Sequence, residues 1–327
     1  MRLMLCLICG IAALGGNALS AHEDKARAYI YKAPSIPPEK GYFVQEIRGG
    51  LYWVTDGLYN TIFLVSSQGV IAVDPLPNLG ERYLKAIAEV TDKSITHVIY
   101  SHEHTDHIGA AYLLPKSAVY IAQKKTAGLL ARRKDPRRPV PTVTFDESYT
   151  LTVGDQTLVL DYKGANHQTG NIFIYAPRQK VLMLVDVVYP GWMPYKNLGI
   201  AEDVPGYIQA HHDALSYDFD TFVGGHVDRL GTRADVETSL EFVSDLQNTV
   251  ATEVAQLPFP LYLKQVSSPD HRWDRHNDYE LAVVDACYSK LIPKWSTRLE
   301  GSETYLKDNC WAMLESLAVQ FPEVQKN

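Results

Sequence analysis

Short apolar runs separated by polar turns fill the first third of the chain and predict a sheet followed by helices. Four runs of β type follow a Pro-rich leader, and their length and spacing predict one meandering sheet: residues 42–47, 51–55, 61–67 and 70–74. Apolar spacing of three and four then predicts a helix over residues 79–90. A strand is expected at 95–100, and a second helix from about His107 to Leu114.

The second part of the chain again combines strand-like apolar runs with segments of helical apolar spacing. Five more apolar runs predict strands at residues 118–122, 157–164, 171–177, 180–186 and 221–225. Three more segments have helical spacing: residues 126–134, 204–217 and 233–257. Because blocks of strands and helices occur in two similar halves, the chain is predicted to be an α/β protein of two packed sheets with helices outside.

Beyond residue 257 the pattern becomes helical throughout. Residues 277–295 and 302–321 both have apolar positions three and four apart, so they predict a helical C-terminal extension. The predicted organisation of the chain is therefore a main domain with segments on either side of it: residues 1–20, a signal peptide; 21–41, a leader; 42–257, the main domain; 258–327, the extension.

The first twenty residues have the pattern of a secretory signal. Arg2 precedes an apolar run from Leu3 to Leu14, and small residues follow at Ala18 and Ser20. The apolar run is shorter than the roughly 20 residues that span a bilayer. We therefore expect cleavage, export to the periplasm or the medium, and no stable membrane anchor afterwards.

Two cysteines remain once this segment is removed. Cys6 and Cys9 leave with the predicted signal, whereas Cys287 and Cys310 lie in the extension. In an oxidising compartment these two can form a disulfide. Two buried free thiols explain the sequence equally well, so the pairing stays open.

Composition places the chain among ordinary globular proteins. Its 327 residues are 46% hydrophobic and 21% charged, and the formal net charge is −7. This acidic balance gives no reason to expect a nucleic-acid partner. The basic run at residues 124–138 is interpreted as a solvated helix face and loop. We expect a small-molecule substrate, and the sequence leaves the oligomeric state open.

The run SHEHTDH, at residues 101–107, crowds metal-ligating side chains at the end of a predicted strand. His102 and His104 are two apart, so both side chains point to one side of an extended backbone, and Asp106 and His107 follow as the chain enters a helix. Imidazole and carboxylate both suit zinc, which prefers about four ligands. Further ligands are therefore expected from elsewhere.

Three more polar residues stand where apolar runs stop. They are His167, Asp186 and His226. Singly, each such residue is more often a capped histidine or a turn former. Together with the 101–107 run they are better explained as one metal site. His211 and His212 lie in a helical stretch and are assigned to the surface or to the surroundings of the site.

These residues, in this order, resemble the metallo-β-lactamase superfamily. The match includes the H-x-H-x-D-H run, Asp74 at the end of a predicted strand, and residues 164–177, which are similar to the family's G-x-x-H-T-x-G-N segment. It covers roughly residues 42–250 and omits the extension. The resemblance implies a four-layer αββα sandwich, to which the helical extension is added.

The resemblance also implies a two-metal site, with two Zn²⁺ expected and other divalent metals compatible. The implied ligands are His102, His104 and His167 for one ion; Asp106, His107 and His226 for the other; and Asp186 as the bridge. Such a site makes a hydroxide nucleophile from water at neutral pH and polarises a carbonyl or phosphoryl oxygen. Asp106 would also orient the nucleophile and pass its proton to the leaving group. Asp74 would hold a ligand histidine in its tautomer.

The choice of reaction depends on residues 186 and 189. Within the family, a bridging Asp186 is typical of lactonases and phosphodiesterases rather than of the first and third β-lactamase subclasses. Tyr189 has the spacing of the tyrosine that donates a hydrogen bond to the substrate carbonyl in acyl-homoserine lactonases. We therefore expect an exported dinuclear zinc hydrolase of a lactone or ester. The alternatives are a β-lactamase, then a thioesterase or phosphodiesterase.

The loop after Tyr189 cannot be placed from its pattern. Trp192, Met193 and Tyr195 have the composition of an apolar pocket wall, but an ordinary packed loop is the favoured interpretation.

Overall fold

A seven-stranded sheet forms the N-terminal half of the fold. The computed structural model describes residues 32–266 and 271–320, so the predicted signal and most of the leader lie outside the described residues. The strands follow one another in sequence order across the sheet, antiparallel from β1 to β4 and parallel from β4 to β7. Their bounds are β1 Phe43–Arg48, β2 Leu51–Thr55, β3 Asn60–Ser66, β4 Gly69–Val73, β5 Ile95–Ile99, β6 Val119–Gln123 and β7 Val143–Phe145.

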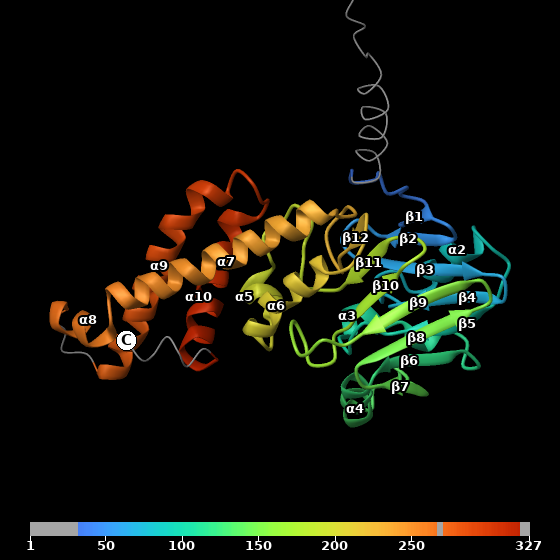
Figure 1. Ribbon diagram of the computed structural model, residues 1–327, viewed down its shortest axis with the longest axis horizontal. Coiled ribbons are helices and arrows are strands. Elements are labelled where there is room, and N and C mark those ends of the chain that lie inside the picture. The colour runs from blue at the N-terminus through green and yellow to red at the C-terminus, as the bar shows by residue number, and fades with distance from the viewer. Residues whose placement is uncertain (1–31, 267–270, 321–327) are drawn as a thin grey trace, which may run out of the picture.

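A second sheet of five strands packs on the first (Figure 1). Its order is β12-β11-β10-β9-β8, with only the β11–β12 pair parallel. The bounds are β8 Ser148–Val153, β9 Gln156–Asp161, β10 Phe173–Ala176, β11 Val181–Leu184 and β12 Thr221–Val223. Strands buried on both faces lack polar alternation, and β11 (VLML) is buried at every position.

Three apolar clusters separate the layers. Trp53 and Ile62 of the first sheet meet Leu158 and Met183 of the second in the central cluster. The outer face of the first sheet is covered by α2 Glu81–Ala88, α3 Thr105–Ile108, the short 3₁₀ turn η1 Ala111–Leu113 and α4 Lys124–Arg133. The outer face of the second sheet is covered by α6 Val204–Leu215 and α7 Arg233–Gln256. This confirms the predicted four-layer αββα sandwich.

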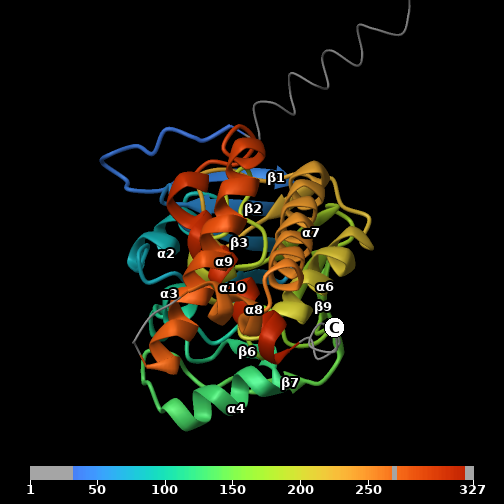
Figure 2. The same cartoon turned by 90° about the vertical axis from the view of Figure 1, so that its left-hand side faces the viewer.

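The C-terminal helices continue the outermost layer. They are α8 Phe259–Gln265, α9 Arg272–Trp295 and α10 Ser302–Val319. Trp295 and Leu306 lie in the same apolar cluster as Phe242 of α7, so the extension shares the core of the outer layer. Figure 2 shows α7, α9 and α10 packed side by side. A disulfide joins α9 to α10 through Cys287 and Cys310, which decides the question that the sequence left open.

One predicted helix differs from the structure, and three elements were not predicted. The helix expected from His107 to Leu114 is instead the single turn of α3 followed by η1, because the chain turns at Gly109 and Ala110. The three-residue strand β7 and the six-residue strand β8 were not predicted, and neither was α5 Lys196–Ile200. Within the described residues, no helix is both long and apolar enough to cross a bilayer.

Candidate metal centre

The candidate ligands come from loops that follow the strands at one edge of the sandwich. His102 and His104 follow β5, and α3 begins immediately afterwards, so Asp106 and His107 lie in its single turn. The remaining three come from the second sheet: His167 between β9 and β10, Asp186 after β11, and His226 after β12. The fold thus brings seven side chains from four segments into one cluster.

The ligand atoms fall into two groups that meet at one carboxylate. The first group is His102, His104, His167 and Asp186, and the second is Asp106, His107 and His226; within each group the atoms lie within 4.8 Å of one another. Asp186 Oδ2 lies 3.2 Å from His167 Nε2 and 3.0 Å from His107 Nε2. Its Oδ1 lies 3.0 Å from His226 Nε2. Asp186 therefore contacts imidazoles of both groups.

Several imidazole nitrogens of the cluster are buried without a hydrogen-bond partner in the described part of the chain. They include His102 Nε2, His107 Nδ1 and His167 Nδ1. A buried polar atom left unpaired costs about 1–3 kcal/mol, so such a concentration of them needs a ligand to explain it. Imidazole nitrogens with a carboxylate are donors that divalent metals of the zinc type prefer. The residues present therefore fit a metal.

Protonation states within the cluster also suit a metal. Burial, together with the neighbouring imidazoles, holds the pKa of His102 well below its usual range, and burial lowers the pKa of His167 to about 4. Burial would raise the pKa of Asp186, but three histidines hold it well below its usual range. His107 differs: burial would lower its pKa, but the negative charge of Asp186 raises it to about 9. A metal must displace a proton from this imidazole.

Asp74 supports the cluster through Ser101. Its Oδ1 accepts a 2.8 Å hydrogen bond from the backbone N–H of Ser101, whose hydroxyl lies 2.9 Å from His102 Nδ1. Asp74 is fully buried, and its burial raises its pKa to about 6. No direct hydrogen bond joins Asp74 to a histidine of the cluster among the described residues. Asp74 is therefore linked to His102 through Ser101.

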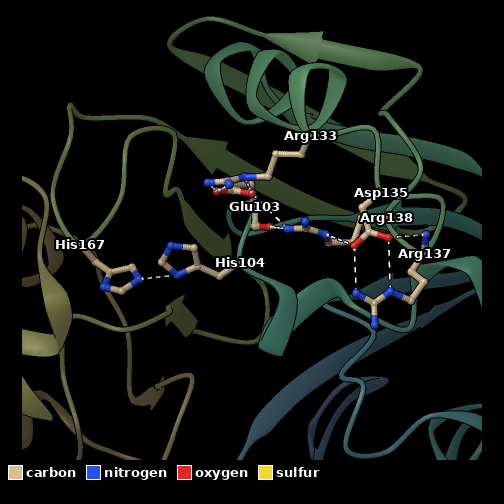
Figure 3. A network of polar contacts seen from close by, with 7 residues as sticks. All are labelled: Glu103, His104, Arg133, Asp135, Arg137, Arg138 and His167. Carbon is tan, nitrogen blue, oxygen red and sulfur yellow. Dashed lines mark hydrogen bonds and ion pairs between the residues drawn. The ribbon is translucent and has the colours of Figure 1, made fainter.

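Glu103, between the two histidines of the run, is neutralised by arginines on the side away from the cluster (Figure 3). Its buried carboxylate binds Arg133 of α4 at 2.6 Å and Arg138 at 3.0 Å. Arg138 also donates to the backbone carbonyl of Glu103, and Asp135 binds Arg138 in turn. The basic run predicted to be solvated therefore sends Arg138 inward, while Arg133 stays exposed and binds Glu103 from the surface. Both arginines fix the loop that carries His102 and His104.

Asn60 of β3 holds the loop that carries His226. Its Nδ2 donates to the carbonyls of His226 and Val227 at 2.9 and 2.8 Å, and its Oδ1 accepts from Trp53 Nε1. Val227 has a φ of 70°, which is strained for a β-branched residue and costs of the order of 1–3 kcal/mol. Asn60 could not be identified from the sequence, because a polar residue at the start of a strand carries no motif.

A cavity of about 610 Å³ opens over the cluster. Asp106, Asp186, His104, His167 and His226 lie at its floor. The walls are largely apolar and aromatic, from Tyr59, Trp192, Met193, Tyr195 and Tyr305, among others. Trp192, Met193 and Tyr195 thus line the cavity, where the sequence had favoured an ordinary packed loop. Tyr305 of α10 and Tyr59 were not predicted.

Tyr189 lies beside the cluster, with its ring stacked 5.9 Å from that of His226. Burial, and then the negative charge of Asp186, raise the pKa of its phenol well above the usual value. The hydroxyl therefore stays protonated and can donate a hydrogen bond into the cavity. His211, assigned to the surface or the surroundings of the site, is instead a core residue that contacts the Tyr207 carbonyl and Ser239 Oγ.

A four-layer αββα sandwich with a His/Asp cluster at its strand ends defines a class of metal-dependent hydrolases. Comparison with known proteins gives the family. The profile described as the Metallo-beta-lactamase superfamily matches residues 54–236, more than half of the chain. The chain belongs to the metallo-β-lactamase superfamily.

Relatives within the superfamily are distant. The chain is 29% identical to 2,4-dinitroanisole O-demethylase subunit alpha of Nocardioides sp. (strain JS1661) over 229 residues, 68% of this chain and 67% of that protein. It is 26% identical to metallo-β-lactamase type 2 of Elizabethkingia meningoseptica over 196 residues, 58% of this chain and 76% of the relative. The solved metallo-β-lactamase from Pontibacter korlensis superposes with a TM-score of 0.55 at 20% identity, over 62% of this chain and 99% of that one. This likeness shows the fold alone.

Proposed function

We propose that the protein is a dinuclear zinc hydrolase that cleaves a lactone or ester carrying a neutral apolar or aromatic group. One observation supports this most directly: two ligand groups meet at Asp186 on the floor of an aromatic-lined cavity. His102, His104 and His167 would hold one ion, Asp106, His107 and His226 the other, with Asp186 shared. When bound, the ions supply a hydroxide nucleophile at neutral pH and polarise the substrate carbonyl.

Two protein groups act on the substrate in this proposal. The side chain of Asp106 is 45% exposed and lies 3.5 and 3.8 Å from the Nε2 atoms of His107 and His226. It can orient the attacking oxygen and then pass a proton to the leaving alkoxide. The protonated phenol of Tyr189 can donate a hydrogen bond to the carbonyl oxygen as negative charge develops on it.

The side chains that line the cavity favour a neutral substrate. No Lys or Arg lines it among the described residues, and Asp228 adds a carboxylate to its wall. A β-lactam carboxylate would find no basic side chain there, whereas an aryl or alkyl group would be covered by Tyr59, Trp192 and Tyr305. The relative named for 2,4-dinitroanisole, a neutral aromatic ether, supports a neutral aromatic group on the substrate.

β-Lactam hydrolysis is the second candidate, supported by the relative that carries that name. One panel separates the two: an aryl acetate, an N-acyl-homoserine lactone, nitrocefin and a bis-aryl phosphodiester, each assayed with added zinc. We expect ester or lactone turnover at least tenfold above the other two. Tyr189→Phe should lower it about 100-fold, as loss of one oxyanion donor does, and the exposed Tyr112→Phe should not.

Turnover of nitrocefin far above the esters, with Tyr189→Phe indistinguishable from the parent, would instead favour the β-lactamase.

We further propose export and cleavage of the signal, which lies outside the described residues. The Arg2 and Leu3–Leu14 pattern supports it, and so does the Cys287–Cys310 disulfide, since such bonds persist in oxidising compartments. Mass spectrometry of the periplasmic or secreted fraction should find an N-terminus near Ala21 or His22 and a non-reduced peptide pair. An intact Met1 in the membrane fraction would contradict this proposal.

A further inference from the structure

The cavity wall formed by residues 190–201 is held in place by the C-terminal extension. The backbone N–H of Met193 donates to the carbonyl of Glu300 at 2.8 Å, and that of Glu300 donates to the carbonyl of Gly191 at 2.9 Å. Asn309 of α10 adds two side-chain bonds: Oδ1 accepts from Leu198 N at 2.7 Å, and Nδ2 donates to the Pro194 carbonyl at 3.0 Å. Asn309 is fully buried, so both bonds are shielded from water.

The segment that Asn309 binds has an unusual backbone. Within α5, Asn197, Leu198 and Gly199 have φ values of 55°, 55° and 67°, and Ile200 follows at 53°. Consecutive left-handed L-residues are unfavourable and persist only where their surroundings impose them. The side-chain bond to Leu198 lies within this left-handed turn, and α10 packs against α5 (Figure 1). Asn309 is therefore well placed to impose it.

The left-handed turn also lies against Tyr189 and Asp186, at the candidate metal cluster. A Cβ added to Gly199 would lie 2.6 Å from the Tyr189 hydroxyl oxygen and 3.2 Å from the Asp186 carbonyl oxygen. The bare backbone of Gly199 therefore backs the phenol. The extension also reaches the cavity directly, because Tyr305 lines it and packs on Tyr195 with ring centroids 5.5 Å apart.

We propose that Asn309 is a positioning residue for the reaction: it fixes the Leu198–Gly199 turn, which sets the place of the Tyr189 hydroxyl over the cluster. This inference rests on the proposed hydrolysis, in which Tyr189 stabilises the oxyanion. The C-terminal extension then acts in catalysis as well as in stability. Asn309 itself touches no substrate.

Two measurements on the zinc-loaded full chain test it, with Asn309→Ala compared with Asn248→Ala, an exposed asparagine on α7. The first is hydrogen exchange of the peptide covering residues 193–201, which needs no substrate. We expect Asn309→Ala to reduce its protection at least tenfold and Asn248→Ala to leave it unchanged. If Asn309→Ala leaves the protection of this peptide unchanged, Asn309 does not fix the turn and the inference is wrong.

The second measurement is kcat for the aryl ester, with and without Tyr189→Phe. Asn309→Ala should lower kcat about tenfold in the parent, but less than twofold in the Tyr189→Phe background, because the positioned hydroxyl is already missing. Equal losses in both backgrounds would show a merely structural role and overturn the inference. Should Asn309→Ala fail to fold, Asn309→Asp, which keeps the acceptor for Leu198 N–H and loses the donor to the Pro194 carbonyl, takes its place in both measurements. If the parent hydrolyses no ester, the proposed function fails, whereas the exchange result still decides whether Asn309 holds the turn.

Discussion

Gly225 lies between two residues of the cluster, and its lack of a side chain lets them approach. A Cβ at this position would meet Asp186 Oδ1 at 2.6 Å and His107 Cε1 at 2.9 Å. Gly225→Ala should therefore displace the shared carboxylate and weaken metal binding 10- to 100-fold, the range typical of residues that support metal ligands. Chelator competition on the purified variant measures the affinity directly.

Gly128 supplies the matched control. A Cβ there would meet only Arg132 Nη1, at 3.8 Å, and Gly128 lies within α4. Gly128→Ala should leave metal affinity unchanged and raise the free energy of unfolding by up to about 1 kcal/mol, the helix preference of Ala over Gly. Equal metal affinity in the two variants would contradict the account of Gly225.

At the scale of elements, ion pairs attach the extension to α7. The Glu241 carboxylate accepts from Arg298 at 2.7 and 2.6 Å and pairs with Lys294 at 2.8 Å. Arg298 first, and then Lys294, lower the pKa of Glu241 to about 2. A lowered pKa stabilises the folded state above the unfolded value near 4.5, and this contribution disappears as the pH falls through about 2.

Because the Glu241 side chain is 43% exposed, solvent screens most of this gain. Glu241→Gln should lower the free energy of unfolding at pH 7 by about 0.5 kcal/mol, and the difference should shrink below pH 4.5. Glu237→Gln, which removes the same charge from an exposed position of α7, should have a smaller effect. Urea unfolding at several pH values compares the three proteins; a difference that grows at acid pH would contradict this account.

Strands and helices with a regular spacing of apolar residues could be predicted from the sequence. Elements that depend on tertiary contacts could not. Strands such as β11 and the long helix α7 follow their apolar spacing. The turn in α5 has no such signal, because its left-handed residues depend on Asn309, more than one hundred positions away. The short edge strand β7 is likewise defined by pairing with β6 rather than by its three residues.

At the scale of the whole molecule, the order of the His and Asp residues along the chain predicted both the fold and the candidate cluster. These residues lie in α3 and in the loops that follow β5, β9, β11 and β12, and the cluster brings the ends of these four strands to one edge of the sandwich. The residues that support the cluster could not be predicted. Asn60, Gly225 and Arg138 act through contacts between distant segments and belong to no motif.

The most direct test of the account is the metal content of the purified, exported protein. Elemental analysis after extensive dialysis should find about two zinc ions per chain. Asp186→Asn, which keeps the shape but removes the shared charge, should retain fewer than one, whereas Asp146→Asn, at an exposed carboxylate, should retain two. A parent protein that holds no stoichiometric metal, or an Asp186→Asn variant that holds as much as the parent, would contradict the dinuclear centre.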